Sequence, residues 1–156
     1  MRQIPEHNKC RKGCFTMSSI KQSMTTHVAT VSPNQTIQEA AALMHQHNVG
    51  AIPVVDGGEL KGMLTDRDIA LRTTAQGRDG QTPVSHVMSS AVVSGNPEMS
   101  LEEASHLMAQ HQIRRLPIVD QNHLVGIVAL GDLAVDQRSN ESAGAALSNI
   151  SSQNTQ

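Results

Sequence analysis

The sequence has almost no aromatic residues: Phe15 is the single one among 156 residues, and tryptophan and tyrosine are absent. Proteins that bind single-stranded nucleic acid stack the bases on aromatic side chains. Duplex binding and attraction to anionic membranes both need a basic surface, and here the formal net charge is −2. We therefore expect no nucleic acid and no membrane among the partners.

Long apolar runs are also missing, since none approaches the roughly 20 residues of a membrane-spanning helix. The N-terminal region lacks the basic start, apolar stretch and small-residue cleavage site of a signal peptide. These absences predict a soluble, cytoplasmic protein.

Cysteine is scarce, and Cys10 and Cys14 both lie in a basic, polar leader. A structural zinc site needs four ligands, and only His7 is close by. We therefore expect no bound metal. We interpret residues 1–19 as a disordered leader, of which residues 1–16 could precede a native start at Met17. The Ser-, Asn- and Gln-rich residues 138–156 are interpreted as a disordered tail.

An internal repeat dominates the remainder of the chain. Residues 24–70 align without a gap on residues 88–134, and 16 positions are identical at an offset of 64. A period of this length carries one supersecondary unit per copy, and such copies share a core. The sequence predicts one unit at 20–77, a linker at 78–83 and a second unit at 84–137, so any site between them should have a related counterpart.

Each copy has the same pattern of predicted elements. An extended segment, 27–31 or 91–94, precedes a hydroxyl residue with a glutamate three positions later, the pattern of a helix capping box. An amphipathic helix follows, then a β-hairpin around Asp56-Gly57 or Gln121-Asn122, then a second helix, 66–72 or 130–135. Proline at positions 53 and 117 cannot donate to a sheet ladder, which places these residues at a strand start or on an edge strand. The predicted fold class is α+β, with two β-α-β-β-α units.

Two aspartates follow the hairpins at equivalent positions. Asp68 comes three residues after Thr65, and Asp132 comes three residues after Ala129. A carboxylate can accept hydrogen bonds from the two hydroxyls of a ribose, and helix starts favour anions. A lone aspartate at such a place more often caps the helix, but its recurrence at the same offset favours a nucleoside site.

Arg114 and Arg115 form the second chemical feature, because two guanidinium groups stand between apolar residues. Arginine is the preferred partner of phosphate oxygens. The equivalent residues in the first copy, Gly50 and Ala51, bring no charge.

Catalytic patterns are absent: no Ser-His-Asp order, phosphate-binding loop or close carboxylate pair stands out. We interpret the histidines as surface residues and the stretch from Gly77 to Gly80 as linker. The chain is predicted not to be an enzyme.

Together these motifs resemble the cystathionine-beta-synthase (CBS) domain family, and residues 20–137 look like one CBS pair, or Bateman module. The resemblance rests on the Met-Thr start, the two Pro-containing strands and both Gly-x-x-x-x-x-Asp endings. It implies two units packed through their sheets about a pseudo-twofold axis, with two clefts for adenosine-containing ligands.

The resemblance also implies the residues of each cleft. In the first, Thr65 and Asp68 would contact ribose, Val93 and Ile113 would flank adenine, and Arg114 and Arg115 would meet phosphate. In the second, Asp132 would combine with Ala29, Val49 and Gly50. Ala129 replaces the family's hydroxyl residue there, so the second site should be weaker.

The family resemblance implies a regulatory module that needs no cofactor. Its regulatory ligand would be AMP, ADP, ATP or S-adenosylmethionine, and it would act through an effector protein of unknown identity. The alternative is a constitutive assembly module with vestigial pockets. A homodimer is expected, through a self-complementary apolar face formed by Ile69, Ala70, Leu71, Leu133, Ala134 and Val135.

Overall fold

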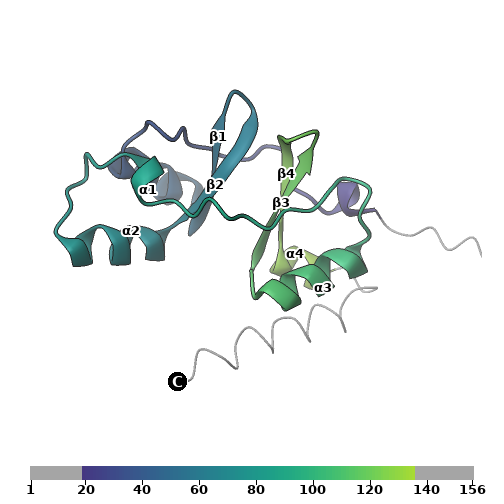
Figure 1. Ribbon diagram of the computed structural model, residues 1–156. Coiled ribbons are helices and arrows are strands. Elements are labelled where there is room, and N and C mark those ends of the chain that lie inside the picture. Colours follow the sequence, from purple (N-terminus) through teal and green to yellow (C-terminus); the bar gives the residue numbers. More distant parts are fainter. Residues whose placement is uncertain (1–18, 136–156) are drawn as a thin grey trace, which may run out of the picture.

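The computed structural model describes residues 19–135, so the predictions for the leader and the tail lie outside it. The fold has two halves, each with a long helix, a β-hairpin and a short helix (Figure 1). The first half contains α1 (Ile37–His47), β1 (Ala51–Asp56), β2 (Glu59–Thr65) and α2 (Asp66–Arg72). The second contains α3 (Leu101–His111), β3 (Arg115–Asp120), β4 (His123–Ala129) and α4 (Leu130–Val135). The predicted α+β class is confirmed.

The two long helices begin at the predicted capping boxes. The Thr36 hydroxyl accepts from the Glu39 amide, and the Glu39 carboxylate accepts from the Thr36 amide. Ser100 and Glu103 repeat this pair of bonds at α3. Because each cap uses residues only three apart, the sequence alone encodes both helix starts.

Both hairpins have two-residue turns in which the central residues have positive φ. These residues are Gly57 and Gly58 in the first hairpin and Gln121 and Asn122 in the second. Two positive φ values match the right-handed twist of the flanking strands. The first turn is therefore centred one residue later than the predicted Asp56-Gly57.

The hairpins join in one four-stranded antiparallel sheet of order β1-β2-β4-β3, linked between Glu59 and His123. The proline-containing strands β1 and β3 are its edges, as predicted. On the outer side of β1, the Pro53 carbonyl accepts from the Val31 amide, and the Val55 amide donates to the Val31 carbonyl. Proline lacks only the amide that would point away from β2, so it fits this edge.

The predicted extended segments 27–31 and 91–94 do not form regular strands. Single parallel bridges, Val31 to Val54 and Gly95 to Ile118, are found instead. Pro33 and Pro97 follow each bridge by two residues, and a proline cannot donate to a continuing ladder. The first strand of each predicted unit is thus reduced to one bridge.

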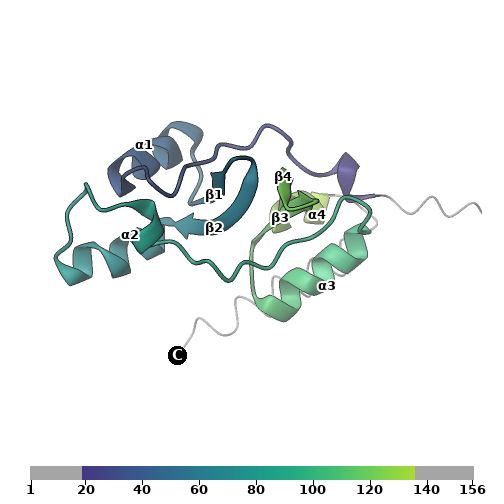
Figure 2. The same cartoon turned by 45° about the horizontal axis from the view of Figure 1, so that its top comes forward.

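Two segments cross between the halves. Residues 19–25, the first crossing segment, precede the first half in sequence but pack on the second, where Ile20 is completely buried. Residues 84–93, the second crossing segment, begin with Val84 and Val87 buried in the core of the first half. Figure 2 shows the purple helix η1 (Ile20–Gln22) next to the start of α3. The two halves of the fold therefore do not coincide with the two sequence repeats, because the core of each half includes a segment of the other repeat.

The short helices α2 and α4 occupy the predicted residues, but they present only part of the predicted apolar face. Leu133 is completely buried in the core of the second half, and Ile69 packs against the core of the first half. Leu71 remains 54% exposed. Ala70 and Ala134 are exposed as well, so the predicted dimer face is corrected by removing Leu133, which is buried and cannot contact a second copy.

Candidate functional site

A cleft of about 850 Å³ lies between the two halves. All six residues predicted for the first site line it: Thr65, Asp68, Val93, Ile113, Arg114 and Arg115. Its volume is in the range typical of small-molecule sites. Residues separated by up to 50 positions in the sequence thus share one surface.

Strand pairing explains why these residues meet. Thr65 ends β2 opposite Ala51 at the start of β1, so the hydroxyl residue and Gly50 lie at one edge of the first hairpin. Arg115 opens β3 opposite Ala129 in the same way. The second crossing segment supplies the wall between them, through Ala91, Val92 and Val93.

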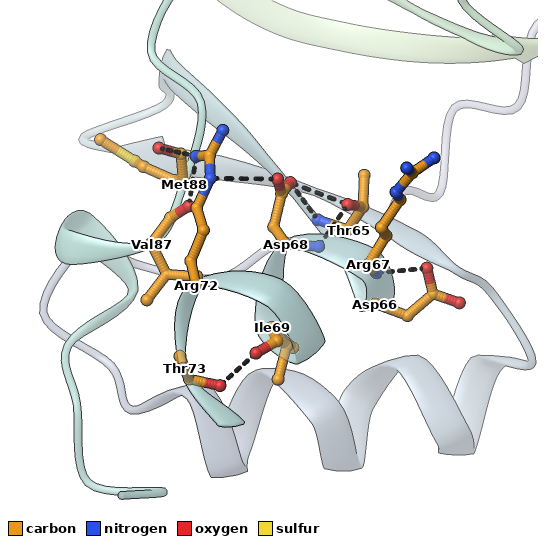
Figure 3. A network of polar contacts seen from close by, with 9 residues as sticks. All are labelled: Thr65, Asp66, Arg67, Asp68, Ile69, Arg72, Thr73, Val87 and Met88. Carbon is orange, nitrogen blue, oxygen red and sulfur yellow. Dashed lines mark hydrogen bonds and ion pairs between the residues drawn. The ribbon is translucent and has the colours of Figure 1, made fainter. Parts of the chain in front are cut away.

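Asp68 is the third residue of α2 and takes part in a capping box with Thr65 (Figure 3). Its Oδ2 accepts from the Thr65 hydroxyl at 2.7 Å and from the Thr65 amide at 3.1 Å. Its Oδ1 lies 3.5 Å from Nε of Arg72. The Asp68 side chain is 17% exposed, so the carboxylate is fixed at the edge of the cleft by groups of its own half.

The opposite side of the cleft is basic. Arg114 is exposed and Arg115 is partly buried. Among residues 19–135, the ion pairs use other cations, namely Lys21, Lys61 and Arg72. The two guanidinium groups are therefore available to an anion within the described part of the chain.

Several lining residues were not predicted from the sequence. These are Ala51, Met63, Asp66, Arg67, Ser89, Ala91, Val92, His111, Gln112 and Pro117. Asp66 and Arg67 lie between Thr65 and Asp68 in the sequence, so they could have been expected to line the same cleft. His111 was interpreted as a surface residue; it is exposed, but it also lines the cleft. Nothing in the sequence indicated that Ser89 lines the cleft, because its place depends on how the second crossing segment packs.

The residues predicted for the second site are distributed differently. Gly50 lines the first cleft, whereas Ala29 and Val49 pack against the core of the first half. Asp132 is exposed, and its Oδ2 accepts from the Ala129 amide at 3.3 Å. Asp132 thus repeats the backbone contact of Asp68, but Ala129 has no hydroxyl to complete the pair.

Metal-ligating side chains do not cluster within residues 19–135, where no three His, Cys, Asp or Glu residues could hold an ion. In the same part of the chain, no helix has the length and apolarity needed to cross a membrane.

The geometry defines a tandem pair of α+β units with a cleft between them, and comparisons with known proteins agree. The CBS domain model matches residues 17–72 and 84–135. The chain therefore belongs to the CBS domain family and contains two tandem units.

Relatives and solved structures support this assignment. The CBS domain-containing protein YhcV of Bacillus subtilis is 84% identical over 138 residues, which are 88% of this chain and 99% of that protein. Hypoxic response protein 1 of Mycobacterium tuberculosis is 34% identical over 120 residues, 76% of this chain and 84% of that protein. A crystal structure of Hypoxic Response Protein I with two coordinated zinc ions has a TM-score of 0.71 and 33% identity, and the match covers 76% of this chain and 98% of that one.

A hexameric CBS-CP12 protein from bloom-forming cyanobacteria is a further structural neighbour, with a TM-score of 0.70 and 28% identity. The match covers 81% of this chain and 71% of that chain. CBS pairs commonly bind small ligands and oligomerise, and stand-alone CBS proteins are generally regulatory and not enzymatic.

Proposed function

We propose that this protein is a stand-alone regulatory module that binds an adenosine-containing ligand in the first cleft and signals by altered binding to a protein partner. AMP, ADP, ATP and S-adenosylmethionine are the candidate ligands. The observation that carries the proposal is the meeting of Asp68, Arg114 and Arg115 around one cleft.

The chemistry of the cleft matches the three parts of a nucleotide. The Asp68 carboxylate can accept hydrogen bonds from ribose hydroxyls. Arg114 and Arg115 can bind phosphate oxygens with their planar forks. Val93 and Ile113, which pack at the edge of the second core, offer an apolar surface to the adenine ring.

The construction of the cleft favours regulation over catalysis. Its walls come from both halves and from the second crossing segment, so a ligand contacts parts that can change their relative packing. A ligand shifts such an equilibrium only if it binds two arrangements with different affinity. We propose that a partner protein reads this difference.

One observation favours the alternative of a constitutive assembly module. Both oxygens of Asp68 already have partners, in Thr65 and in Arg72. An aspartate that only caps α2 would have the same contacts. The two functions differ in ligand binding, which calorimetry measures directly.

The test is calorimetric titration of the full chain with AMP, adenosine and S-adenosylmethionine. Asp68→Ala should weaken AMP binding by about 1.5 to 3 kcal/mol, the usual contribution of a hydrogen bond to a charged group. Asp132→Ala is the matched control, because it removes the equivalent carboxylate of the other repeat, and it should leave the affinity unchanged. Adenosine should bind less tightly than AMP, because it cannot use the arginines.

Failure of all three ligands to bind the unmodified protein would favour the assembly module. Equal affinity in Asp68→Ala and the unmodified protein, with the helical content checked by circular dichroism, would remove Asp68 from the site.

A further inference from the structure

Arg72 joins α2 to the second crossing segment through one guanidinium group (Figure 3). Its Nη1 donates to the Val87 carbonyl at 2.7 Å and to the Met88 carbonyl at 3.2 Å. Its Nε lies 3.5 Å from Oδ1 of Asp68. A side chain at the end of α2 therefore connects the cleft carboxylate to the second crossing segment.

The second crossing segment is also part of the cleft. After the buried Val87, the Ser89 amide donates to the Met63 carbonyl at 2.9 Å, and the Met63 amide donates back to the Ser89 carbonyl. Residues 91–93 then form the wall of the cleft. Arg72 thus holds the segment at the two residues immediately before this pairing.

We infer that Arg72 is a positioning residue, which orients the Asp68 carboxylate for the ligand and transmits the state of that carboxylate to the second crossing segment. The inference rests on the proposed function for its ligand, but the contacts that link Asp68 through Arg72 to the segment are observed directly.

The sharing of the two carboxylate oxygens explains the orientation. Thr65 holds Oδ2, and Arg72 is the cation beside Oδ1. A ligand hydroxyl that donates to Asp68 must share or displace one of these partners, and Oδ1 has the weaker contact. The Arg72 side chain is 45% exposed, so water screens the attraction, and the fork geometry matters more than the charge.

The sequence differs between the two repeats at this position. The position equivalent to Arg72 at an offset of 64 is Asp136, which carries the opposite charge. The sequence therefore offers a guanidinium group at this position in the first repeat alone, the repeat that also supplies Thr65 and Asp68 to the cleft.

The first experiment needs no ligand. Hydrogen exchange of the Ser89 amide is measured in the unmodified protein, Arg72→Gln and Asp68→Asn. Exchange should be about tenfold faster or more in Arg72→Gln, because the charge-assisted hydrogen bonds to the Val87 and Met88 carbonyls are lost, and it should also be faster in Asp68→Asn. Arg78→Gln is the matched control, because Arg78 is exposed and lies outside the cleft lining, and it should leave the rate unchanged.

The second experiment compares AMP with 2′,3′-dideoxyadenosine monophosphate, which lacks both ribose hydroxyls. Arg72→Gln should weaken AMP binding several-fold and leave the dideoxy analogue unchanged, since only AMP uses Asp68. Arg72→Lys keeps the charge but not the planar fork, and it should behave like Arg72→Gln.

The outcomes separate the two ideas. Suppose that exchange of the Ser89 amide is faster in Arg72→Gln but has the rate of the unmodified protein in Asp68→Asn. This result would overturn the inference that Arg72 transmits the state of Asp68 to the second crossing segment. The positioning role would be overturned if Arg72→Gln weakened the binding of AMP and of the dideoxy analogue equally. It would also be overturned if Arg72→Lys bound AMP as tightly as the unmodified protein, because the positive charge alone would then suffice. If AMP fails to bind the unmodified protein, the proposed function fails, whereas the exchange rates still decide whether Asp68 and the segment are coupled.

Discussion

Single residues fix how closely the crossing segments approach the hairpins. Gly62 in β2 and Gly126 in β4 are equivalent positions, and each lies under the crossing segment from the other repeat. An added Cβ at Gly62 would be 2.8 Å from the Ser89 carbonyl oxygen. At Gly126 it would be 3.1 Å from the Thr25 carbonyl oxygen. Glycine is needed at both places because a backbone, which cannot rotate away, occupies the space.

Gly62→Ala should therefore destabilise the protein by about 1 to 3 kcal/mol, the usual cost of overpacking. Gly131→Ala is the matched control, because an added Cβ there meets nothing within 4 Å and α4 is helical. That control should be neutral or stabilise by roughly 0.5 to 1 kcal/mol. Urea unfolding of the three proteins measures both effects, and an equally stable Gly62→Ala would show that the crossing segment moves freely.

The sequence predicted most of the candidate cleft at this scale, although ligand binding there stays a prediction. Thr65, Asp68, Arg114 and Arg115 were found because their chemistry recurs, or is replaced, at a fixed offset. The i,i+4 spacing of Asp68 and Arg72 was visible in the sequence. The contact of Arg72 with the second crossing segment was missed, since its partners there are the carbonyls of Val87 and Met88. Every residue has a carbonyl, so no pattern of side chains marks such a contact.

Among the elements, the long helices show the strongest local encoding. Ser100 accepts from the Glu103 amide at 3.1 Å, and the Glu103 carboxylate accepts from the Ser100 amide at 2.8 Å. The hydrogen bond from the Ser100 backbone lowers the pKa of Glu103, and the Ser100 side chain adds to this effect. The depressed pKa means that the carboxylate's contribution to stability is present above the ordinary glutamate pKa and is lost as the pH falls through the lowered value.

Ser100→Ala should raise the pKa of Glu103 only in part, because the side-chain contribution of Ser100 is lost and the larger backbone contribution remains. It should also cost about 1 kcal/mol of stability, because it removes the N-cap of α3. An NMR titration of the Glu103 side chain and thermal unfolding at neutral pH measure the two effects. Ser94→Ala, at an exposed serine before the helix, should change neither. Unaltered thermal stability of Ser100→Ala would contradict the role of the cap.

The crossing segments were the elements that the sequence did not reveal. Their short extended stretches were predicted. The sequence did not show that each segment packs in the core of the half formed by the other repeat. Ile20 and Val84 are equivalent residues in similar surroundings, so the pattern of apolar residues fits either half equally well. Only the three-dimensional packing decides which core receives each one.

At the scale of the whole molecule, the two repeats differ in the groups available to a ligand. Thr65 is matched by Ala129, and Arg114 and Arg115 are matched by Gly50 and Ala51. The described structure places the hydroxyl and both arginines in the same cleft. We predict one AMP per chain at moderate concentration, measured by calorimetry. Two equal sites, both abolished only by replacing Asp68 and Asp132 together, would contradict this asymmetry.

Self-association is the second prediction for the whole molecule. Because Leu133 and Ile69 are occupied by the cores, the exposed Leu71 is the main apolar side chain left on α2. We predict a dimer by analytical ultracentrifugation at high micromolar protein, and a shift toward monomer in Leu71→Asp. Gln76→Asp, at an exposed position after α2, is the control. Leu60→Asp could not serve as the control, since Leu60 is partly buried in a hairpin. A monomer mass for the unmodified chain would refute the prediction.

The exchange of crossing segments also determines the order in which the chain can fold during synthesis. Ile20 leaves the ribosome about 80 residues before Met99, whose carbonyl accepts from the Ile20 amide, and translation proceeds at ≈ 5–20 residues per second. The first half can close as soon as Val84 and Val87 emerge, but residues 19–25 must wait for the second half. The earliest part of the fold is therefore among the last to dock, and a ribosome that stops after the first repeat leaves Ile20 without its core.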